Sequence, residues 1–249
     1  MTITNNQLLK SITVADVALN FPQALKILQR HSLDYCCGGK KPFVQVCEKA
    51  GLDVNVIWQE LQHAKANHGS DKRMHFDSWN APLLIDFILQ HHHTYVRESI
   101  PLIQELLDKV CNVHGEDSPF LLDVRENFSA LAEELLDHLP KEEEILFPAI
   151  RKLFKQQDES HDLGFIPSNL QTPIAMMEHE HDRAGHLIKE IRRITNNYTP
   201  PVYACPTFKA TYIMLEQFDQ DLMQHIHLEN NILFPKAKVA STGGSCAIV

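Results

Sequence analysis

The chain has 249 residues, which is enough for one large domain or for a small domain followed by a helical bundle. Its formal net charge is −9, with 23 lysines and arginines against 32 aspartates and glutamates, so nucleic acid is not an expected partner. No apolar run approaches the roughly 20 residues of a membrane span, and the amino terminus lacks the pattern of a secretory signal. The six cysteines, two adjacent and the others scattered, do not form a framework typical of secreted proteins. We therefore expect a cytoplasmic protein without a membrane partner.

Residues 1–65 are predicted to form a small domain of short helices. Each predicted helix opens with a residue that favours a helix start: Thr13 before residues 14–19, Pro22 before residues 23–30, and Asp53 before residues 54–63. The polar stretch over residues 64–77 is predicted to be a linker between this domain and the remainder of the chain.

Between the second and third predicted helices lies the stretch Asp34-Tyr35-Cys36-Cys37-Gly38-Gly39-Lys40. Its two glycines allow the backbone to turn through positive φ and to approach a partner closely. Adjacent cysteines form only a strained disulfide, so a resting bridge between Cys36 and Cys37 is not expected. Two interpretations remain open. The thiols meet a cluster, an iron ion or nitric oxide, or they are small buried residues of a turn.

The rest of the chain, residues 78–240, is predicted to form four long helices. The expected bounds are Asn80 to Cys111 with a bend at Pro101, Ser118 to Phe154, Thr172 to Thr195, and a last helix that follows the stretch 200–206 and ends near Lys238. The second and third are expected to start with a capping residue and a proline, Ser118-Pro119 and Thr172-Pro173. The predicted fold class is therefore all-α.

One pattern, H-x-x-x-E-x-x-I-L-F-P, occurs twice, over residues 138–148 and 225–235. A four-residue step on a helix places the imidazole and the carboxylate on one face, one turn apart. Each pair can therefore bind a metal ion and bridge to a neighbouring one. A single copy would fit an apolar core segment with charged neighbours in solvent, but a solvated face has no reason to repeat its spacing. Pro148 and Pro235, which close the two copies, are expected to bend or end their helices.

Two more histidines follow from the symmetry of helical hairpins, because residues at one level of a hairpin are equally far from its loop. The first loop centres near Gly115, and His93 lies 45 residues before His138. The second centres near Val202, and His181 lies 44 residues before His225. Two independent hairpins thus place a histidine level with the repeated pattern.

The predicted metal ligands are four imidazoles and two carboxylates: His93, His138, Glu142, His181, His225 and Glu229. This donor set disfavours metals that seek thiolates and suits a pair of iron ions, with zinc and manganese as alternatives. Ferritin-like sites use Glu-x-x-His and more carboxylates, so the pattern is closer to hemerythrin. The other histidines near the site are expected to be surface or packing residues: His91, His92, His114, His179 and His227.

The repeated pattern and the D-Y-C-C-G-G stretch together resemble the repair of iron centres family, the YtfE/ScdA type, along nearly the whole chain. Further matching stretches begin at Met177, Thr195 and Leu228. The resemblance implies a hemerythrin-like four-helix bundle preceded by a small helical domain. It also implies a non-heme centre of two iron ions, carboxylate- and oxo-bridged, on the six ligands named above.

The resemblance implies repair or re-supply of iron to iron–sulfur clusters damaged by nitric oxide or oxidants. The expected partners are damaged iron–sulfur proteins, with nitric oxide or dioxygen as small ligands and Cys36 and Cys37 taking part in the repair. Oligomeric state stays open, a homodimer included, and so does the question of whether the protein is an enzyme. The alternative functions are a carrier or sensor of oxygen or nitric oxide, and a structural zinc bundle.

Two features depart from the family pattern. Pro140 lies inside the first copy of the metal-binding pattern, where the second copy has no proline, and is expected to distort that turn. The tail, residues 241–249, extends beyond the usual end and is expected to be flexible. Its last four residues, Cys246-Ala247-Ile248-Val249, formally resemble a prenylation box, for which a bacterial protein would have no enzyme.

Overall fold

The computed structural model describes residues 9, 11–21, 24–66, 74–158 and 170–242. Their regular structure is helical apart from one isolated antiparallel bridge between Thr13 and Pro42, which confirms the predicted all-α class. The chain divides into two compact units, one of Met1–Asn80 with Ile226–Pro235 and one of Ala81–His225 with Lys236–Val249. Among the described helices, none has the length and apolar character needed to cross a lipid bilayer.

Among the residues that the structure describes, the first unit contains the amino-terminal helices α2 (Val14–Asn20), α3 (Ala24–Arg30), α4 (Phe43–Lys49) and α5 (Val54–Ala66). Thr13 caps α2 as predicted, in a capping box with Asp16. At the start of α5, the Asp53 carboxylate accepts a hydrogen bond of 2.8 Å from the backbone N–H of Asn55. The predicted role of Pro22 and residues 67–73 of the predicted linker lie outside the described residues.

Helix α4 is an element that the sequence analysis did not predict. Its N-cap position is occupied by Pro42, which makes no side-chain hydrogen bond to the helix. The helix is nevertheless fixed by packing, because Phe43 is buried and its ring lies 6.2 Å from that of Trp58. Phe21 meets the same indole at 4.9 Å, so Trp58 is the centre of a small aromatic core.

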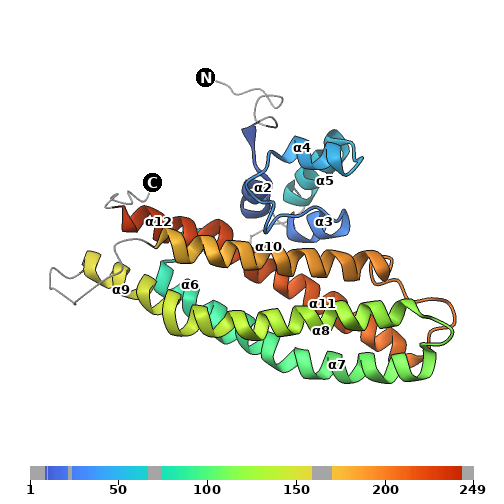
Figure 1. Cartoon of the computed structure of the whole chain (residues 1–249). Coiled ribbons are helices and arrows are strands. Elements are labelled where there is room, and N and C mark those ends of the chain that lie inside the picture. Colours follow the sequence, from blue (N-terminus) through green and yellow to red (C-terminus); the bar gives the residue numbers. More distant parts are fainter. Residues whose placement is uncertain (1–8, 10, 22–23, 67–73, 159–169, 243–249) are drawn as a thin grey trace. The chain divides into compact units, whose positions relative to one another are not determined.

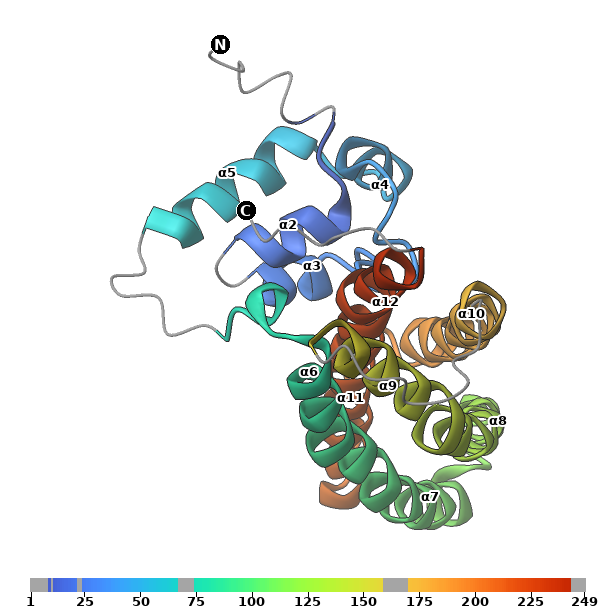
Figure 2. The ribbon, with the colours of Figure 1, turned by 90° about the vertical axis from the view of Figure 1, so that its left-hand side faces the viewer.

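The bundle is built from four long rods (Figures 1 and 2), each of which the sequence predicted. Three of the rods are interrupted by a π-helical turn. In chain order the elements are η1 (Phe76–Ser78), α6 (Ala81–Phe87), η2 (Ile88–His93), α7 (Thr94–His114), α8 (Phe120–Lys141), η3 (Glu142–Leu146), α9 (Phe147–Asp158), α10 (Gln171–Ile194), α11 (Pro206–Leu228), η4 (Glu229–Leu233) and α12 (Phe234–Ser241). Two expected helix starts are wrong. Helix α8 begins at Phe120 with Pro119 at its cap position, so Ser118 is not the cap. Helix α10 begins at Gln171 with Leu170 at its cap position, so Thr172 lies inside the helix.

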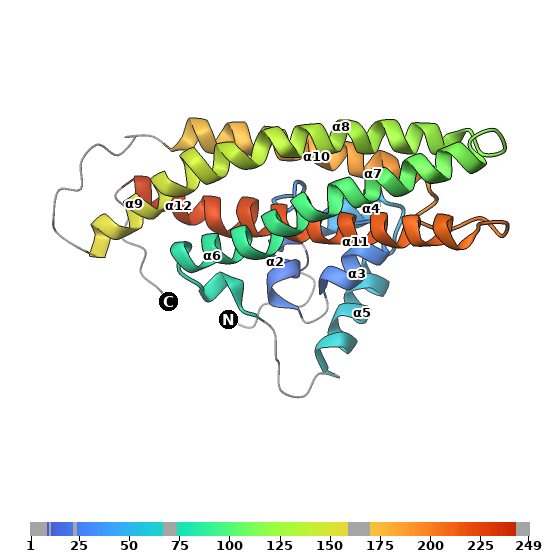
Figure 3. The same ribbon diagram turned by 90° about the horizontal axis from the view of Figure 1, so that it is seen from below.

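The two prolines that close the repeated pattern do not end their helices. The N–H of Phe147 bonds to the carbonyl of Glu142, and that of Phe234 bonds to Glu229, each five residues back. A proline follows each phenylalanine, and its ring excludes the ordinary α-helical carbonyl four residues back. The wider π turn accommodates the proline and lets the helix continue, so that α9 follows α8 and α12 follows α11 (Figure 3). Pro140 likewise lies inside α8, which runs on to Lys141.

An ion pair between the largely buried Arg192 side chain and the buried Asp219 carboxylate joins α10 to α11. The Arg192 guanidinium donates two hydrogen bonds, of 2.8 and 2.6 Å, to the carboxylate of Asp219. Tyr198 donates a third hydrogen bond, of 2.8 Å, to the same carboxylate. Burial raises the pKa of Asp219, and the charge and hydrogen bonds of Arg192 oppose that rise. The Asp219 carboxylate therefore supplies the hydrogen-bond acceptors and the opposite charge that the largely buried Arg192 guanidinium needs.

We expect Asp219→Ala to lower the free energy of unfolding by about 3–5 kcal/mol, because it leaves the Arg192 charge buried without its partner. Urea denaturation followed by circular dichroism measures this change. Asp108→Ala is the matched control, since Asp108 pairs with Arg125 at an exposed site. That variant should change the free energy of unfolding by no more than about 0.5 kcal/mol. Equal effects from the two variants would contradict the importance of the buried pair.

Candidate metal centre

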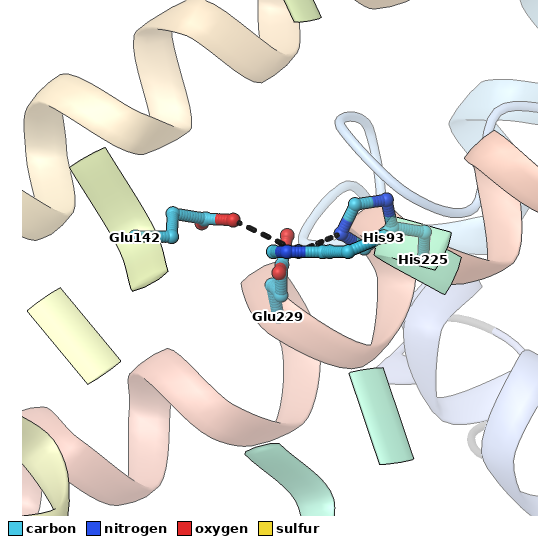
Figure 4. Close-up of side chains that lie close together, drawn as sticks. All are labelled: His93, Glu142, His225 and Glu229. Carbon is cyan, nitrogen blue, oxygen red and sulfur yellow. Dashed lines mark hydrogen bonds and ion pairs between the residues drawn. The ribbon is translucent and has the colours of Figure 1, made fainter. Parts of the chain in front are cut away.

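The structure brings all six predicted ligands into one buried region. All six lie on the four rods: His93 in η2, His138 in α8, Glu142 at the start of η3, His181 in α10, His225 in α11 and Glu229 at the start of η4. All six are between 0% and 3% exposed. They form two groups, His93–Glu142–His225–Glu229 and His138–Glu142–His181–Glu229, and the donor atoms within each group lie within 4.8 Å of one another. Figure 4 shows Glu142 reaching towards His93 and His225 in the first group.

Within each group, two imidazoles face each other through their Nε2 atoms. The Nε2 atoms of His93 and His225 are 3.1 Å apart, and those of His138 and His181 are also 3.1 Å apart. Metal–imidazole bonds of about 2.1 Å that meet at a right angle place two nitrogens about 3 Å apart. The spacing of each pair therefore fits two ligands of one metal ion.

Glu142 lies between the two imidazole pairs. One of its oxygens, Oε2, is 3.4 Å from His93 Nε2 and 3.3 Å from His138 Nε2. The other, Oε1, is 3.9 Å from His181 Nε2. Both Glu142 and Glu229 are members of both groups. A carboxylate in this position can bridge two metal ions, which is the arrangement expected from the repeated pattern.

The family comparisons agree with this geometry. The family model described as Hemerythrin HHE cation binding domain matches residues 84–237, and the Domain of Unknown function DUF542, named ScdA_N, matches residues 10–65. The chain is 38% identical to the iron-sulfur cluster repair protein YtfE of Yersinia pseudotuberculosis serotype IB (strain PB1/+) over 223 residues. That match covers 89% of this chain and 94% of the relative. The corresponding protein of Yersinia pestis (strain Pestoides F) is 37% identical over the same share of each chain.

The chain belongs to the YtfE family. Its hemerythrin domain is a cation-binding domain and contains all six of the clustered residues, so the buried groups are the region in which the family assignment implies bound iron.

Two further glutamates, which the sequence analysis did not single out, hold the imidazoles from behind. Glu143 Oε1 is 2.7 Å from His93 Nδ1, and Glu180 Oε2 is 2.7 Å from His138 Nδ1. A carboxylate only accepts hydrogen bonds, so in the neutral imidazole Nδ1 carries the proton and Nε2 presents its lone pair to the centre. A signal was present in the sequence, because each glutamate is adjacent to a predicted ligand, Glu142 or His181.

Each of these glutamates is itself held by a cation. Arg97 donates hydrogen bonds of 2.7 and 3.0 Å to Glu143, and Lys141 donates one of 2.7 Å to Glu180. Partial burial acts to raise the pKa of both carboxyls, but the hydrogen bonds from the cations and histidines outweigh it and lower each pKa. Both glutamates are therefore carboxylates at neutral pH, able to fix the orientation of the imidazoles.

Glu143→Gln should weaken metal binding roughly 10- to 100-fold, the range found when the hydrogen-bond partner of a metal-bound histidine is removed. An amide can turn its NH₂ group towards His93 Nδ1 and favour the wrong tautomer. Chelator competition measures the affinity. The matched control is Glu144→Gln at the exposed neighbouring position, which should bind metal as the wild type does. If both variants behaved alike, the proposed support of His93 by Glu143 would be wrong.

A cavity of about 320 Å³ is lined by residues of α8 and α10, among them His138 and His181. It gives small molecules a route to one of the two imidazole pairs. The cavity is also lined by four acidic side chains and by two basic ones, Lys141 and Arg183, so its charged lining is acidic on balance and favours cations over anions.

The other histidines stay outside the two central groups. His91 and His179 are exposed, and His92 is buried but bonds to Asp221. His114 is the last residue of α7, and its Nε2 lies 3.3 Å from Cys205 Sγ. His227 is buried against Tyr35, with ring centroids 5.5 Å apart, and burial lowers its pKa to about 4. It is a packing residue, one of the two roles expected from the sequence.

Asp34, Cys36 and Cys37 form a third cluster of donor atoms, within 4.8 Å of one another, in the stretch 34–39, which we call the thiol loop. The two sulfurs are 3.4 Å apart and are not joined by a disulfide bond. Asp34 Oδ1 accepts hydrogen bonds from the backbone N–H groups of both cysteines. Burial, followed by the neighbouring Cys37 thiol, raises the pKa of Cys36 well above its usual value. Cys36 is therefore a neutral thiol in this conformation.

The thiol loop is held against residues 226–235 of the same unit. Asn231 donates hydrogen bonds of 3.2 and 3.1 Å to the carbonyl oxygens of Tyr35 and Cys36. A Cβ on Gly39 would lie 2.6 Å from Asn231 Oδ1 and 2.7 Å from the Tyr35 carbonyl oxygen. Gly39 is thus required for close approach, as expected. The expected positive φ is wrong for Gly38 and Gly39, and Gly51 is the glycine that adopts it in the described residues.

Proposed function

We propose that the protein binds two iron ions at the six clustered residues and uses them to repair iron–sulfur clusters damaged by nitric oxide or oxidants. The observation that carries the proposal is the pair of buried ligand groups that share Glu142 and Glu229. Two imidazoles for each ion and two shared carboxylates suit a non-heme di-iron centre, carboxylate- and oxo-bridged. The repair role draws on the relatives, which are named iron-sulfur cluster repair proteins.

The residues of the chain have distinct tasks in this proposal. His93 and His225 hold one ion, His138 and His181 hold the other, and the shared carboxylates set the distance between the two. Glu143 and Glu180 keep the Nε2 lone pairs of their imidazoles directed inward. Bound iron would supply open positions for nitric oxide or dioxygen. The cavity beside His138 and His181 admits such small molecules.

We propose that the thiol loop passes iron from the metal centre to the damaged iron–sulfur cluster. Its cluster shares no residue with the two central groups, and the proposal therefore does not include the thiols among the ligands of the resting centre. Cys36 is 1% exposed, and its raised pKa keeps it from acting as a thiolate until the loop opens. Opening would let Cys36 and Cys37 receive iron or meet a damaged cluster. The proposed domains are residues 1–65, which include the thiol loop, and residues 78–240, which form the bundle, followed by a tail over residues 241–249.

The test is reactivation of an iron–sulfur dehydratase that nitric oxide has inactivated, incubated anaerobically with the iron-loaded protein and a reductant. We expect recovery of dehydratase activity that depends on the iron load, with the apoprotein giving only the background of free iron. Mössbauer spectroscopy of the loaded protein should report two iron ions per chain. Reversible binding of dioxygen or nitric oxide without any reactivation would instead favour a carrier or sensor. Stoichiometric zinc in place of iron would favour a structural bundle.

A further inference from the structure

A third histidine–carboxylate cluster lies in the second unit, apart from the two central groups. His91 and His92 come from η2, and Asp221 comes from α11. Each offers one donor atom, and the three atoms lie within 4.8 Å of one another. None of the three residues belongs to either central group.

The buried part of this cluster has polar atoms that the fold does not satisfy. His92 is 0% exposed, and its Nδ1 lies 2.9 Å from Asp221 Oδ1. Its other ring nitrogen, Nε2, and the second oxygen of Asp221 are both buried without a hydrogen-bond partner among the described residues. Buried polar atoms in native proteins nearly always have partners, so the unpartnered Asp221 oxygen, on the carboxylate that already faces His92 Nδ1, points to a missing ligand beside this pair.

The rings around the cluster lead from solvent to the centre. His91 is exposed and stacks on Phe87 with centroids 5.0 Å apart. Phe87 also packs edge-on against His92, at 5.5 Å. His92 also lies parallel to His225, with an interplanar angle of 1° and centroids 5.4 Å apart. The cluster is thus open to solvent at His91 and is one ring away from a ligand of the central groups.

We propose that His91, His92 and Asp221 form an additional site for a divalent first-row transition metal ion, separate from the central groups. Two imidazoles and one carboxylate suit iron(II), cobalt(II) or zinc(II), whereas magnesium and calcium favour an all-oxygen shell. The remaining positions of the ion are taken by water, because His91 is exposed. A site with only three protein ligands binds more weakly than the central groups, each of which has four.

The site's position gives it a role that rests on the proposed function. An iron ion that arrives from solvent meets His91 first, passes to His92 and Asp221, and has His225 as its next imidazole. The additional site would therefore hold iron(II) on its way into or out of the centre.

The test counts bound metal on full-length protein. Apoprotein is dialysed against excess cobalt(II), and bound cobalt is measured by elemental analysis. Wild type should bind one equivalent more than His91→Ala and one more than Asp221→Asn, an isosteric change that removes the charge. His186→Ala, which removes an exposed histidine of α10 outside the cluster, should match the wild type. Glu142→Ala should lose central metal and keep the additional equivalent.

Equal counts in wild type, His91→Ala and Asp221→Asn would overturn the site, and so would loss of the central ions in both variants. Iron(II) uptake by the apoprotein, followed by the absorption of the central iron, tests the role. Asp221→Asn should slow iron uptake several-fold. An unchanged rate of uptake would show that the additional site does not pass iron to the centre, although the cobalt count could still show that the site exists. If wild type held the additional cobalt but no central metal, the proposed function would fail and this site would remain.

Discussion

A protein that carries both His225→Ala and Glu229→Ala should lose nearly all of its iron. His225 is one half of an imidazole pair, and Glu229 belongs to both ligand groups, so the double change removes donors from each proposed ion. Loss of a partner behind a metal-bound histidine costs 10- to 100-fold in affinity, and loss of two direct ligands should cost at least about 100-fold. Iron analysis after anaerobic purification without an affinity tag measures the result.

His114→Ala is the control for this experiment. His114 lies at the end of α7, where its imidazole meets Cys205, and belongs to neither central group. The variant should retain the iron content of the wild type. A double variant with full iron would refute the assignment of the site. Iron loss in His114→Ala as severe as in His138→Ala would show that the metal is bound elsewhere.

Replacement of both thiols, Cys36→Ser with Cys37→Ser, should abolish repair and leave the iron in place. Serine preserves the size of the side chain and the hydrogen bonds of the backbone to Asp34, so the loop should keep its shape. It removes the sulfur donors that a transferred iron ion would need. Reactivation of a nitric-oxide-damaged dehydratase should therefore fall to the level given by the apoprotein, while the absorption of the iron centre is unchanged.

Cys205→Ser provides the matched control, because Cys205 is also a free cysteine but lies in another part of the chain. It should repair as well as the wild type does. Full repair by the double thiol variant would return Cys36 and Cys37 to the role of small residues in a turn. Loss of iron from that variant would make the cysteines ligands of the centre and the six-residue set incomplete.

The sequence predicted the rods and the central residues because both depend on patterns that repeat. Helical spacing alone relates His138 to Glu142 and His225 to Glu229, and the near-equal arms of two hairpins led to His93 and His181. Each of those histidines does lie 3.1 Å from a partner imidazole, though on different hairpins from those assumed: His93 meets His225, and His138 meets His181. The distance of each histidine from its hairpin loop thus predicted which histidines lie in the central region, but not which two imidazoles face each other.

Other features depend on tertiary contacts that no local pattern encodes. Helix α4 lacks a side-chain cap and is held by the packing of Phe43 near Trp58. The support of His93 by Glu143 joins residues of two different rods. The two I-L-F segments also differ although their sequences are the same, since Ile145 is 66% exposed and Ile232 is 3% exposed. In each case the residues that pack against the side chain from other parts of the chain determine whether it is buried and what it contacts.

The π turns make this centre sensitive to the number of residues as well as to their identity. Phe147, the first residue after η3, lies with its ring 5.7 Å from that of His93. Loss of one codon within residues 143–145 would leave every predicted ligand in the chain, yet it would remove the extra residue of the π turn, and the N–H of Phe147 would then face a carbonyl four residues back. A relative with all six ligands but one residue fewer in such a turn would therefore have an ordinary α turn at this place, and alignment gaps at these positions are as informative as substitutions.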